Sequence, residues 1–120
     1  MSTQYFMVLT DPVEGQDDAY NDWYDNRHLA DVLAVDGFVS AQRFRLSHQK
    51  SPEGVASSSY LAIYEMETDD VDATLAVLMS RLGTPVMPVS PALDPQRLTL
   101  FAATALAAPK RRTYTNRLKF

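Results

Sequence analysis

The amino-acid sequence predicts an α+β fold in which four strands form one antiparallel sheet and two helices cover one of its faces. Three observations carry this prediction: four short runs rich in β-forming residues, two longer segments with helix start and stop signals, and their order along the chain, β-α-β-β-α-β. This order is typical of the ferredoxin-like fold. At 120 residues the chain has the length of one domain.

The first half of the chain is expected to form a strand, a helix and a second strand. Residues 3–10 are rich in β-formers, and residues 11–16 contain an Asp-Pro pair and a glycine, which favour a turn. A helix should begin at about Asp17, because acidic residues gather there and stabilise a helix N-terminus. It should end at Gly37, which can adopt the left-handed conformation of a helix end. The second strand is expected at residues 38–46.

The second half repeats this plan after a loop. Thr68 is expected to cap the second helix, which should end at Gly83. Four prolines make the segment after this helix unsuited to regular structure. The expected loop, strand, helix, irregular segment and last strand are residues 48–58, 59–66, 71–82, 84–96 and 97–106.

Both faces of the predicted sheet are apolar. In the third strand, Tyr60 and Tyr64 lie on one face, while Leu61 and Ile63 lie on the other. An antiparallel sheet with one face in water should instead alternate apolar and polar side chains. Since two helices can cover only one face, the other face is expected to pack against a second copy of the chain in a homodimer.

Charge is unevenly distributed along the chain. Residues 1–109 carry six Lys and Arg against all fifteen Asp and Glu, whereas residues 110–120 carry five basic side chains and no acidic one. An acidic body disfavours contact with a phosphate backbone, so no nucleic-acid partner is expected. The basic tail is expected either to dock on an acidic neighbouring subunit or to be disordered.

Several classes of protein and site are disfavoured by composition. No run of about 18 apolar residues occurs, so no membrane span is expected. The start of the chain lacks the pattern of a secretion signal, and a cytoplasmic location fits this. The absence of cysteine excludes disulfides, thiolate metal ligands and cysteine nucleophiles. Two histidines with scattered carboxylates do not suggest a metal site.

The first predicted helix concentrates side chains that can carry chemistry. At about 100° per residue, Tyr24, His28 and Asp31 fall on one broad stripe. An imidazole that faces the sheet would serve as a general base or acid near neutral pH. Tyr24 would then hold a substrate oxygen and Asp31 would orient the ring. The alternative interpretation is that His28 is a packed or surface residue without a catalytic role.

Five other residues are candidates for substrate binding. The sheet is expected to contribute Tyr5, Tyr60 and Tyr64 to an aromatic pocket. Trp23 is expected to pack in the core or beside a ligand. Arg27 has two interpretations, a solvated charge and a clamp for an anion.

One stretch of the sequence resembles a known family. Residues 23–38, WYDNRHLADVLAVDGF, and the following VSAQRFRL are similar to the first-helix motif of the dimeric α+β barrel superfamily, in the branch named for the ethyl tert-butyl ether degradation protein EthD. Asp36 departs from the motif, where proline is usual. The matching positions are Trp23, Tyr24, His28, Leu29, Gly37, Phe38, Arg43 and Arg45.

The resemblance implies an EthD-like dimeric α+β barrel domain over residues 1–106, with a basic C-terminal tail at residues 107–120 outside it. It also implies that two protomers pack sheet to sheet as a homodimer. The site would lie between the helices and the sheet, where His28 would act on an aromatic or enolisable substrate. No haem-ligand motif of the superfamily is matched, so no cofactor is expected.

These expectations favour a cofactor-independent lyase, cyclase or isomerase that acts on a small aromatic or polyketide-like molecule. His28, Tyr24 and Asp31 would be its catalytic residues. Two alternatives remain open. One is a non-catalytic accessory protein that holds a hydrophobic ligand for a catabolic pathway, and the other is a cofactor-free quinol monooxygenase. Fold similarity alone cannot choose among them.

Overall fold

The computed structural model describes residues 3–50 and 58–113, so most of the predicted loop and the end of the basic tail lie outside the described residues. The predicted order of elements is confirmed, with the first helix divided into three consecutive pieces. The strands are β1 (Thr3–Pro12), β2 (Phe38–Arg45), β3 (Tyr60–Glu67) and β4 (Leu93–Thr104). The helical elements are α1 (Asp17–Trp23), η1 (Tyr24–His28), α2 (Leu29–Leu33) and α3 (Val71–Arg81).

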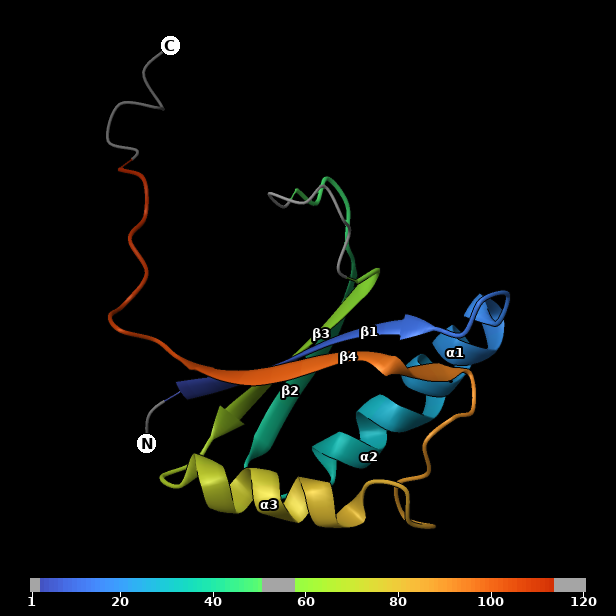
Figure 1. Ribbon diagram of the computed structural model, residues 1–120. Helices are drawn as coiled ribbons and strands as arrows, with labels where there is room; N and C mark the ends of the chain where they lie inside the picture. The colour runs from blue at the N-terminus through green and yellow to red at the C-terminus, as the bar shows by residue number, and fades with distance from the viewer. Residues whose placement is uncertain (1–2, 51–57, 114–120) are drawn as a thin grey trace.

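The four strands form one antiparallel sheet in the order β2-β3-β1-β4. All helical elements lie beneath one face of this sheet, and none of the described helices covers the other face (Figure 1). This is the ferredoxin-like α+β architecture that the sequence predicts. The two halves of the chain each contribute one helical segment to the same face.

Alternation along β1 separates the two faces of the sheet. Phe6 and Val8 are buried between the sheet and the helices, whereas Tyr5 and Met7 are only partly buried on the opposite face. Because β1 is central, it pairs with β3 on one side and β4 on the other. Its side chains therefore fix which residues of both neighbouring strands face the helices.

The last strand begins earlier than the sequence predicts. The segment 84–96 is irregular as far as Ala92, but β4 starts at Leu93 and includes Pro95. The proline is tolerated because β4 is an edge strand, where one side of the backbone needs no partner. A register shift opposite Thr10 and Pro12 accommodates the early start.

The end of the first helical segment has the predicted left-handed glycine. Gly37 has φ +99°, and a Cβ at this position would lie 3.1 Å from Cγ2 of Thr74 in α3. Its carbonyl accepts a hydrogen bond of 2.8 Å from the Glu67 amide at the end of β3. Glycine therefore allows both the turn and a close approach between the two halves of the fold.

The N-cap of α3 lies two residues later than the sequence predicts. Asp70, not Thr68, is the N-cap, and its side chain accepts a hydrogen bond of 3.0 Å from the Ala73 amide. Thr68 instead accepts hydrogen bonds from the Asp70 amide and the Thr74 hydroxyl. Aspartate is as good an N-cap as threonine, and here it stands at the correct spacing from the first free amides.

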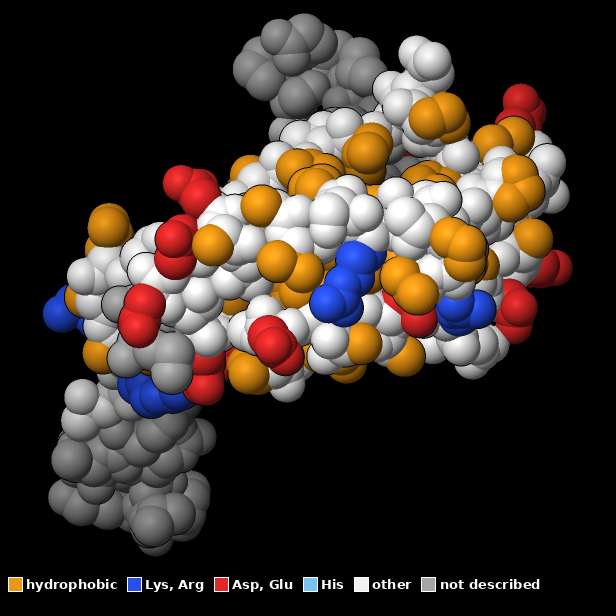
Figure 2. Space-filling view, turned by 90° about the horizontal axis from the view of Figure 1, so that it is seen from below, with side chains coloured by type: hydrophobic (Ala, Val, Ile, Leu, Met, Phe, Trp, Pro, Cys, Tyr) orange, Lys and Arg blue, Asp and Glu red, His pale blue; other side chains and the backbone are white. Residues whose placement is uncertain are grey.

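The hydrophobic core lies between the helices and the sheet. Tyr20, Tyr64, Met66, Leu78 and Met87 are among its most buried side chains. Seen from the helix side, the outer surface mixes acidic, basic and hydrophobic side chains and shows no large patch of one charge (Figure 2). None of the helices in residues 3–50 and 58–113 is both long and apolar enough to cross a bilayer.

Candidate functional site

A cavity of about 300 Å³ lies between the helical segments and the sheet. Its wall is almost wholly apolar, with contributions from β1, β3, β4, α3 and the segment that follows α3. The side chains that bring a polar atom to this wall are Thr10, Trp23, Tyr24, His28 and Tyr64. A concave apolar space with a few polar groups is typical of a small-molecule site.

The first helical segment contains a π-helical turn at the centre of this site. The Leu29 amide bonds to the carbonyl of Tyr24, five residues earlier, instead of four. In a regular α-helix, Trp23 and His28 would point about 140° apart. Across the π-helical turn the two rings are instead stacked, with centroids 4.6 Å apart and planes inclined by 26°. Such turns occur frequently at functional sites.

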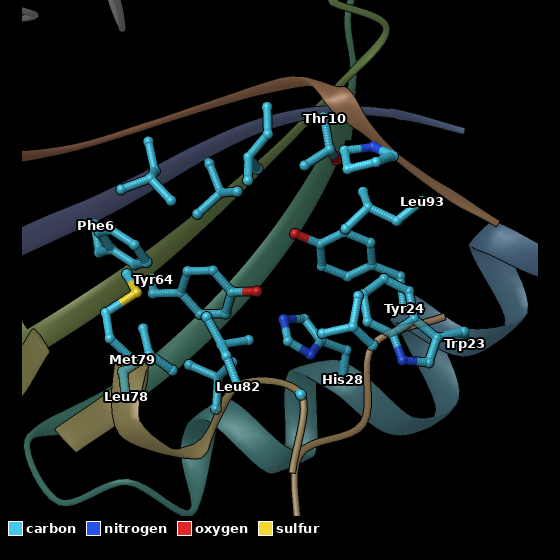
Figure 3. Close-up of a pocket in the computed structure, with 17 residues that line it drawn as sticks. Phe6, Thr10, Trp23, Tyr24, His28, Tyr64, Leu78, Met79, Leu82 and Leu93 are labelled. Carbon is cyan, nitrogen blue, oxygen red and sulfur yellow. The ribbon is translucent and has the colours of Figure 1, made fainter. Parts of the chain in front are cut away.

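Three polar groups converge inside the cavity. The hydroxyls of Tyr24 and Tyr64 point toward one another, and the His28 ring lies next to both (Figure 3). The Tyr24 and His28 ring centroids are 5.2 Å apart. Among the described residues, neither the Tyr64 hydroxyl nor Nδ1 of His28 has a hydrogen-bond partner, although both atoms are buried. Buried polar atoms without partners are costly, so these groups are available to a ligand or water.

Burial controls the ionisation of these groups. It lowers the pKa of His28 from 6.5 to about 4, against the smaller opposing effect of the Asp31 charge. It raises the pKa of Tyr24 to about 12, and burial together with the neighbouring Tyr24 hydroxyl raises the pKa of Tyr64 as well. At pH 7 the site therefore presents a neutral imidazole and two neutral phenols. The ring is a weaker base than an ordinary histidine.

Asp31 does not orient His28 as the sequence analysis expects. Its carboxylate instead accepts a charge-assisted hydrogen bond of 2.7 Å from Nε of Arg27, one helical turn away. Arg27 also reaches the Pro85 carbonyl, at 3.4 Å. With a side chain about half exposed, it is not among the residues that line the cavity, which favours the solvated-charge interpretation. Asp31 acts on His28 through its charge alone.

Two of the three sheet tyrosines lie outside the cavity. Tyr5 is wrongly expected there, because it pairs with Glu65 on the opposite face, while Phe6 pairs with Tyr64. Tyr60 faces the helices but lies farther along β3, against the Tyr20 ring at 5.2 Å. It does not line the cavity. Of the three, only Tyr64 does so.

Sequence reasoning missed Thr10, one of the polar residues of the site. Thr10, whose hydroxyl hydrogen-bonds that of Tyr20, lines the cavity from β1. Trp23, which the sequence places in the core or beside a ligand, lines the cavity, and its Nε1 donates a 3.0 Å hydrogen bond to the Pro88 carbonyl. This bond fastens the proline-rich segment to the helix beside His28. Val89 and Pro95 of this segment line the cavity.

The described part of the chain shows no metal site. No three His, Cys, Asp or Glu side chains gather in residues 3–50 and 58–113 in a way that could hold an ion. His28, the histidine of the cavity, has aromatic and aliphatic neighbours. A neutral imidazole in such surroundings can accept a proton and form hydrogen bonds.

By sequence, the chain matches no family model and no curated protein. Solved structures of the same shape exist. An EthD-like protein from Ralstonia eutropha aligns with 93% of this chain and 99% of its own, at 12% identity and a TM-score of 0.59. The chain has the protomer fold of the dimeric α+β barrel proteins.

Two other proteins with this dimeric α+β barrel fold have described activities. MhuD, a haem degrader from Mycobacterium tuberculosis, aligns over 89% of this chain and 99% of its own, at 14% identity and a TM-score of 0.59. SnoaB, a cofactor-independent oxygenase from Streptomyces nogalater, aligns over 90% and 97%, at 16% identity and a TM-score of 0.54. At such identities the likeness concerns the fold, and the activity has to be argued from the site.

Proposed function

We propose that the cavity binds a small, flat, largely hydrophobic molecule with a carbonyl or phenol oxygen, and that His28 moves a proton on it. The protein would then be a cofactor-independent lyase, cyclase or isomerase of aromatic or polyketide-like compounds. One observation carries the proposal: the imidazole of His28 and the hydroxyls of Tyr24 and Tyr64 converge within a wall that is otherwise apolar (Figure 3).

The proposed step uses these groups as they stand at neutral pH. Neutral His28 accepts the proton from a carbon next to a carbonyl, and the electrons of the C–H bond move onto the carbonyl oxygen. Tyr24 and Tyr64 donate hydrogen bonds to the resulting enolate. The imidazolium then returns the proton to another atom of the same molecule, which isomerises it, or to a leaving group, which is eliminated.

The low pKa of His28 fits this step only if an anion forms beside it. In the empty cavity burial disfavours the imidazolium, which keeps the ring ready to accept a proton. The enolate would supply a neighbouring negative charge and so raise the pKa of His28 during the reaction. Asp31 already acts in the same direction. In this proposal Asp31 is an electrostatic partner of the catalytic histidine.

The experiment uses 2-tetralone, a flat enolisable ketone, as the probe. Exchange of its α-protons in D₂O, followed by NMR, reports proton transfer whatever the natural substrate is. We expect the protein to accelerate exchange and His28→Asn to lower the rate by about 10²–10⁴. The matched control is His48→Asn, since His48 lies on the exposed loop with φ 56°, which asparagine tolerates.

Binding is measured separately from exchange. Trp23 is the sole tryptophan of the sequence and lines the cavity, so its fluorescence reports occupancy. His28→Asn should still bind 2-tetralone with little change in affinity. If the wild-type protein binds the ketone without accelerating exchange, the non-catalytic ligand-binding alternative replaces this proposal. Unchanged exchange in His28→Asn would also refute it.

A cofactor-free monooxygenase is the second candidate. The favouring observation is that neutral His28 could also deprotonate a quinol, while the phenols donate hydrogen bonds to the resulting anion. SnoaB, a cofactor-independent oxygenase, shares the fold. Oxygen uptake with hydroquinone-type compounds tests it. Haem is not proposed as a ligand, because no Arg or Lys is among the residues that line the cavity and could pair with its propionates.

We infer that the open sheet face is the interface of a homodimer. Its central strands carry Met7, Leu9, Leu61 and Ile63, and no described helix covers them. Contiguous apolar faces of this kind are uncommon on monomers. In sedimentation experiments, the wild-type protein should be a dimer and Ile63→Lys a monomer.

The control for the dimer experiment is the same substitution on the helix side. Ser80 is exposed on α3, so Ser80→Lys should leave the dimer intact. A wild-type protein that sediments as a monomer at micromolar concentration would contradict the inference. The proposal for the cavity does not depend on this result, since every residue that it uses belongs to one chain.

A further inference from the structure

Arg43 occupies an unusual position for a charged side chain. It belongs to β2 and faces the helices, where its side chain is 11% exposed. Its Cζ lies 4.4 Å from the centroid of the Tyr24 ring, and 5.3 Å from the centroids of both Tyr20 and Tyr60. The guanidinium is therefore surrounded by three phenol rings. It does not line the cavity, whereas Tyr24 does.

The charge of Arg43 is only partly compensated. Nη1 donates a 2.7 Å hydrogen bond to the Asp25 carboxylate, and Nη2 donates a 2.8 Å hydrogen bond to Oδ1 of Asn21. Nε is buried and has no partner among the described residues. The Asp25 side chain is 57% exposed, so water screens its charge far more than that of Arg43. A net positive potential remains at the aromatic rings.

We propose that Arg43 is a positioning residue of the site, which favours negative charge at the Tyr24 hydroxyl by holding a guanidinium over the ring of that residue. The inference rests on the proposed function and deepens it. A cation over an aromatic face is attracted to the ring, and this attraction grows when the phenol carries negative charge. A hydroxyl polarised in this way donates a stronger hydrogen bond to an anionic oxygen in the cavity.

The groups around Tyr24 come from every element that packs against it. The phenol of Tyr20 on α1 opposes ionisation of Tyr24, whereas the neighbouring hydroxyls of Tyr64 on β3 and Thr10 on β1 and the charge of Arg43 favour it. His28, on the same helical segment, meets the Tyr24 ring edge to face. Arg43 is the cation of this set. The substrate class that benefits is one whose oxygen becomes negative during the reaction, such as a phenol or an enolisable ketone.

A purely structural role has to be distinguished from this one. Arg43 also joins β2 to the first helical segment through Asn21 and Asp25, and such a brace would stabilise the fold without affecting Tyr24. Asp25→Asn breaks the same ion pair but leaves the guanidinium on the ring. Arg43→Gln removes the guanidinium charge and keeps an amide that can hydrogen-bond to Asn21. The two variants therefore separate the structural role of the ion pair from the effect of the guanidinium charge on Tyr24.

The test places 3-fluorotyrosine at position 24, where its more acidic hydroxyl can be titrated by ¹⁹F NMR without substrate. Removing the cation by Arg43→Gln should weaken the acidity of this hydroxyl by about tenfold. Asp25→Asn should leave the titration unchanged or shift it the opposite way. Arg43→Lys keeps a charge without a planar ring contact and should fall between wild type and Arg43→Gln.

The outcomes separate this inference from the proposed function. If Arg43→Gln and Arg43→Lys both titrate like the wild type, the inference is refuted, whatever happens to stability. If Arg43→Gln does not fold, Arg43→Met, which also removes the charge, takes its place, and an unshifted titration again refutes the inference. Loss of the proposed function shows itself differently, as wild-type protein that does not accelerate exchange in 2-tetralone. No titration result can produce that observation.

Discussion

The two helical segments of this protein cover the same sheet face and line the same cavity, yet they contribute different things to it. The segment formed by α1, η1 and α2 supplies Val32 and three side chains with polar atoms, Trp23, Tyr24 and His28. From α3 come only Leu78 and Met79. The halves of the fold are alike in topology and unlike in chemistry.

The two helical segments also differ in how regular their helical structure is. α3 is an uninterrupted helix with a side-chain N-cap at Asp70. The first segment has no side-chain cap and contains the π-helical turn that stacks Trp23 on His28. The comparison teaches that the regular helix contributes apolar wall to the cavity, while the irregular one sets the positions of its polar groups. Substitutions in the two segments should therefore affect different measurements.

The largest expected effect is on proton transfer. Tyr24→Phe removes one hydrogen-bond donor to the enolate and should lower the exchange rate of 2-tetralone by about 10²-fold. The matched change in α3 is Leu78→Met, which conserves volume and should leave the rate nearly unchanged. Equal losses of exchange rate in the two variants would mean that α3 contributes to proton transfer as much as the first helical segment does.

Acid should destabilise the protein through His28. Its pKa in the folded state, about 4, lies below the unfolded value of 6.5. Protons therefore bind the unfolded chain more tightly, and the stability present above pH 6.5 is lost as the pH falls toward 4. The expected loss from this group is about 3 kcal/mol. Urea unfolding across this range measures it, with His28→Asn predicted to flatten the slope and His48→Asn to retain it.

A similar loss of stability is expected when a buried side chain of α3 that lines the cavity is shortened. Leu78 is 2% exposed, and Leu78→Ala should reduce the free energy of unfolding by about 3 kcal/mol. Urea unfolding at pH 7 measures this. The exchange rate of bound 2-tetralone should change little, since no reacting group moves. A large loss of rate at retained affinity would show that α3 positions the chemistry as well.

The smallest predicted effect concerns the start of α3. Asp70→Ala removes the N-cap and should cost about 1 kcal/mol of stability. The neighbouring Asp69 is exposed and makes no capping bond to α3, so Asp69→Ala should cost only a few tenths of a kcal/mol through the helix dipole. Thermal unfolding of both variants compares them. If Asp69→Ala were the more destabilising, the cap assignment would be wrong.

Much of the fold could be predicted from the sequence. Runs of β-formers and the glycines at helix ends give the order of elements, because these signals depend on local backbone preferences. Gly37 was predicted for its left-handed conformation, and its second role against Thr74 depends on contacts that only the fold creates. The start of β4 was missed because Pro95 is unsuited to most strands and acceptable at an edge.

The site was less predictable, for two physical reasons. A π-helical turn has no distinct side-chain pattern, so the stacking of Trp23 on His28 could not be predicted from the sequence. Strand alternation gives two faces but does not tell which one meets the helices, and Tyr5 was therefore placed with Tyr64 instead of opposite to it. The partner of Asp31 was missed because Arg27 and His28 are both within its reach along the helix.

Pro95 has a consequence for how copies of this chain can grow into larger assemblies. No described strand pairs with the outer edge of β4, and unpaired edges can bind strands of other molecules, which leads to aggregation. A proline at this edge lacks the amide hydrogen that such addition needs. Addition of further strands is thereby obstructed where β4 begins. Pro95→Val restores the amide hydrogen and would make this edge more prone to pair with strands of other molecules.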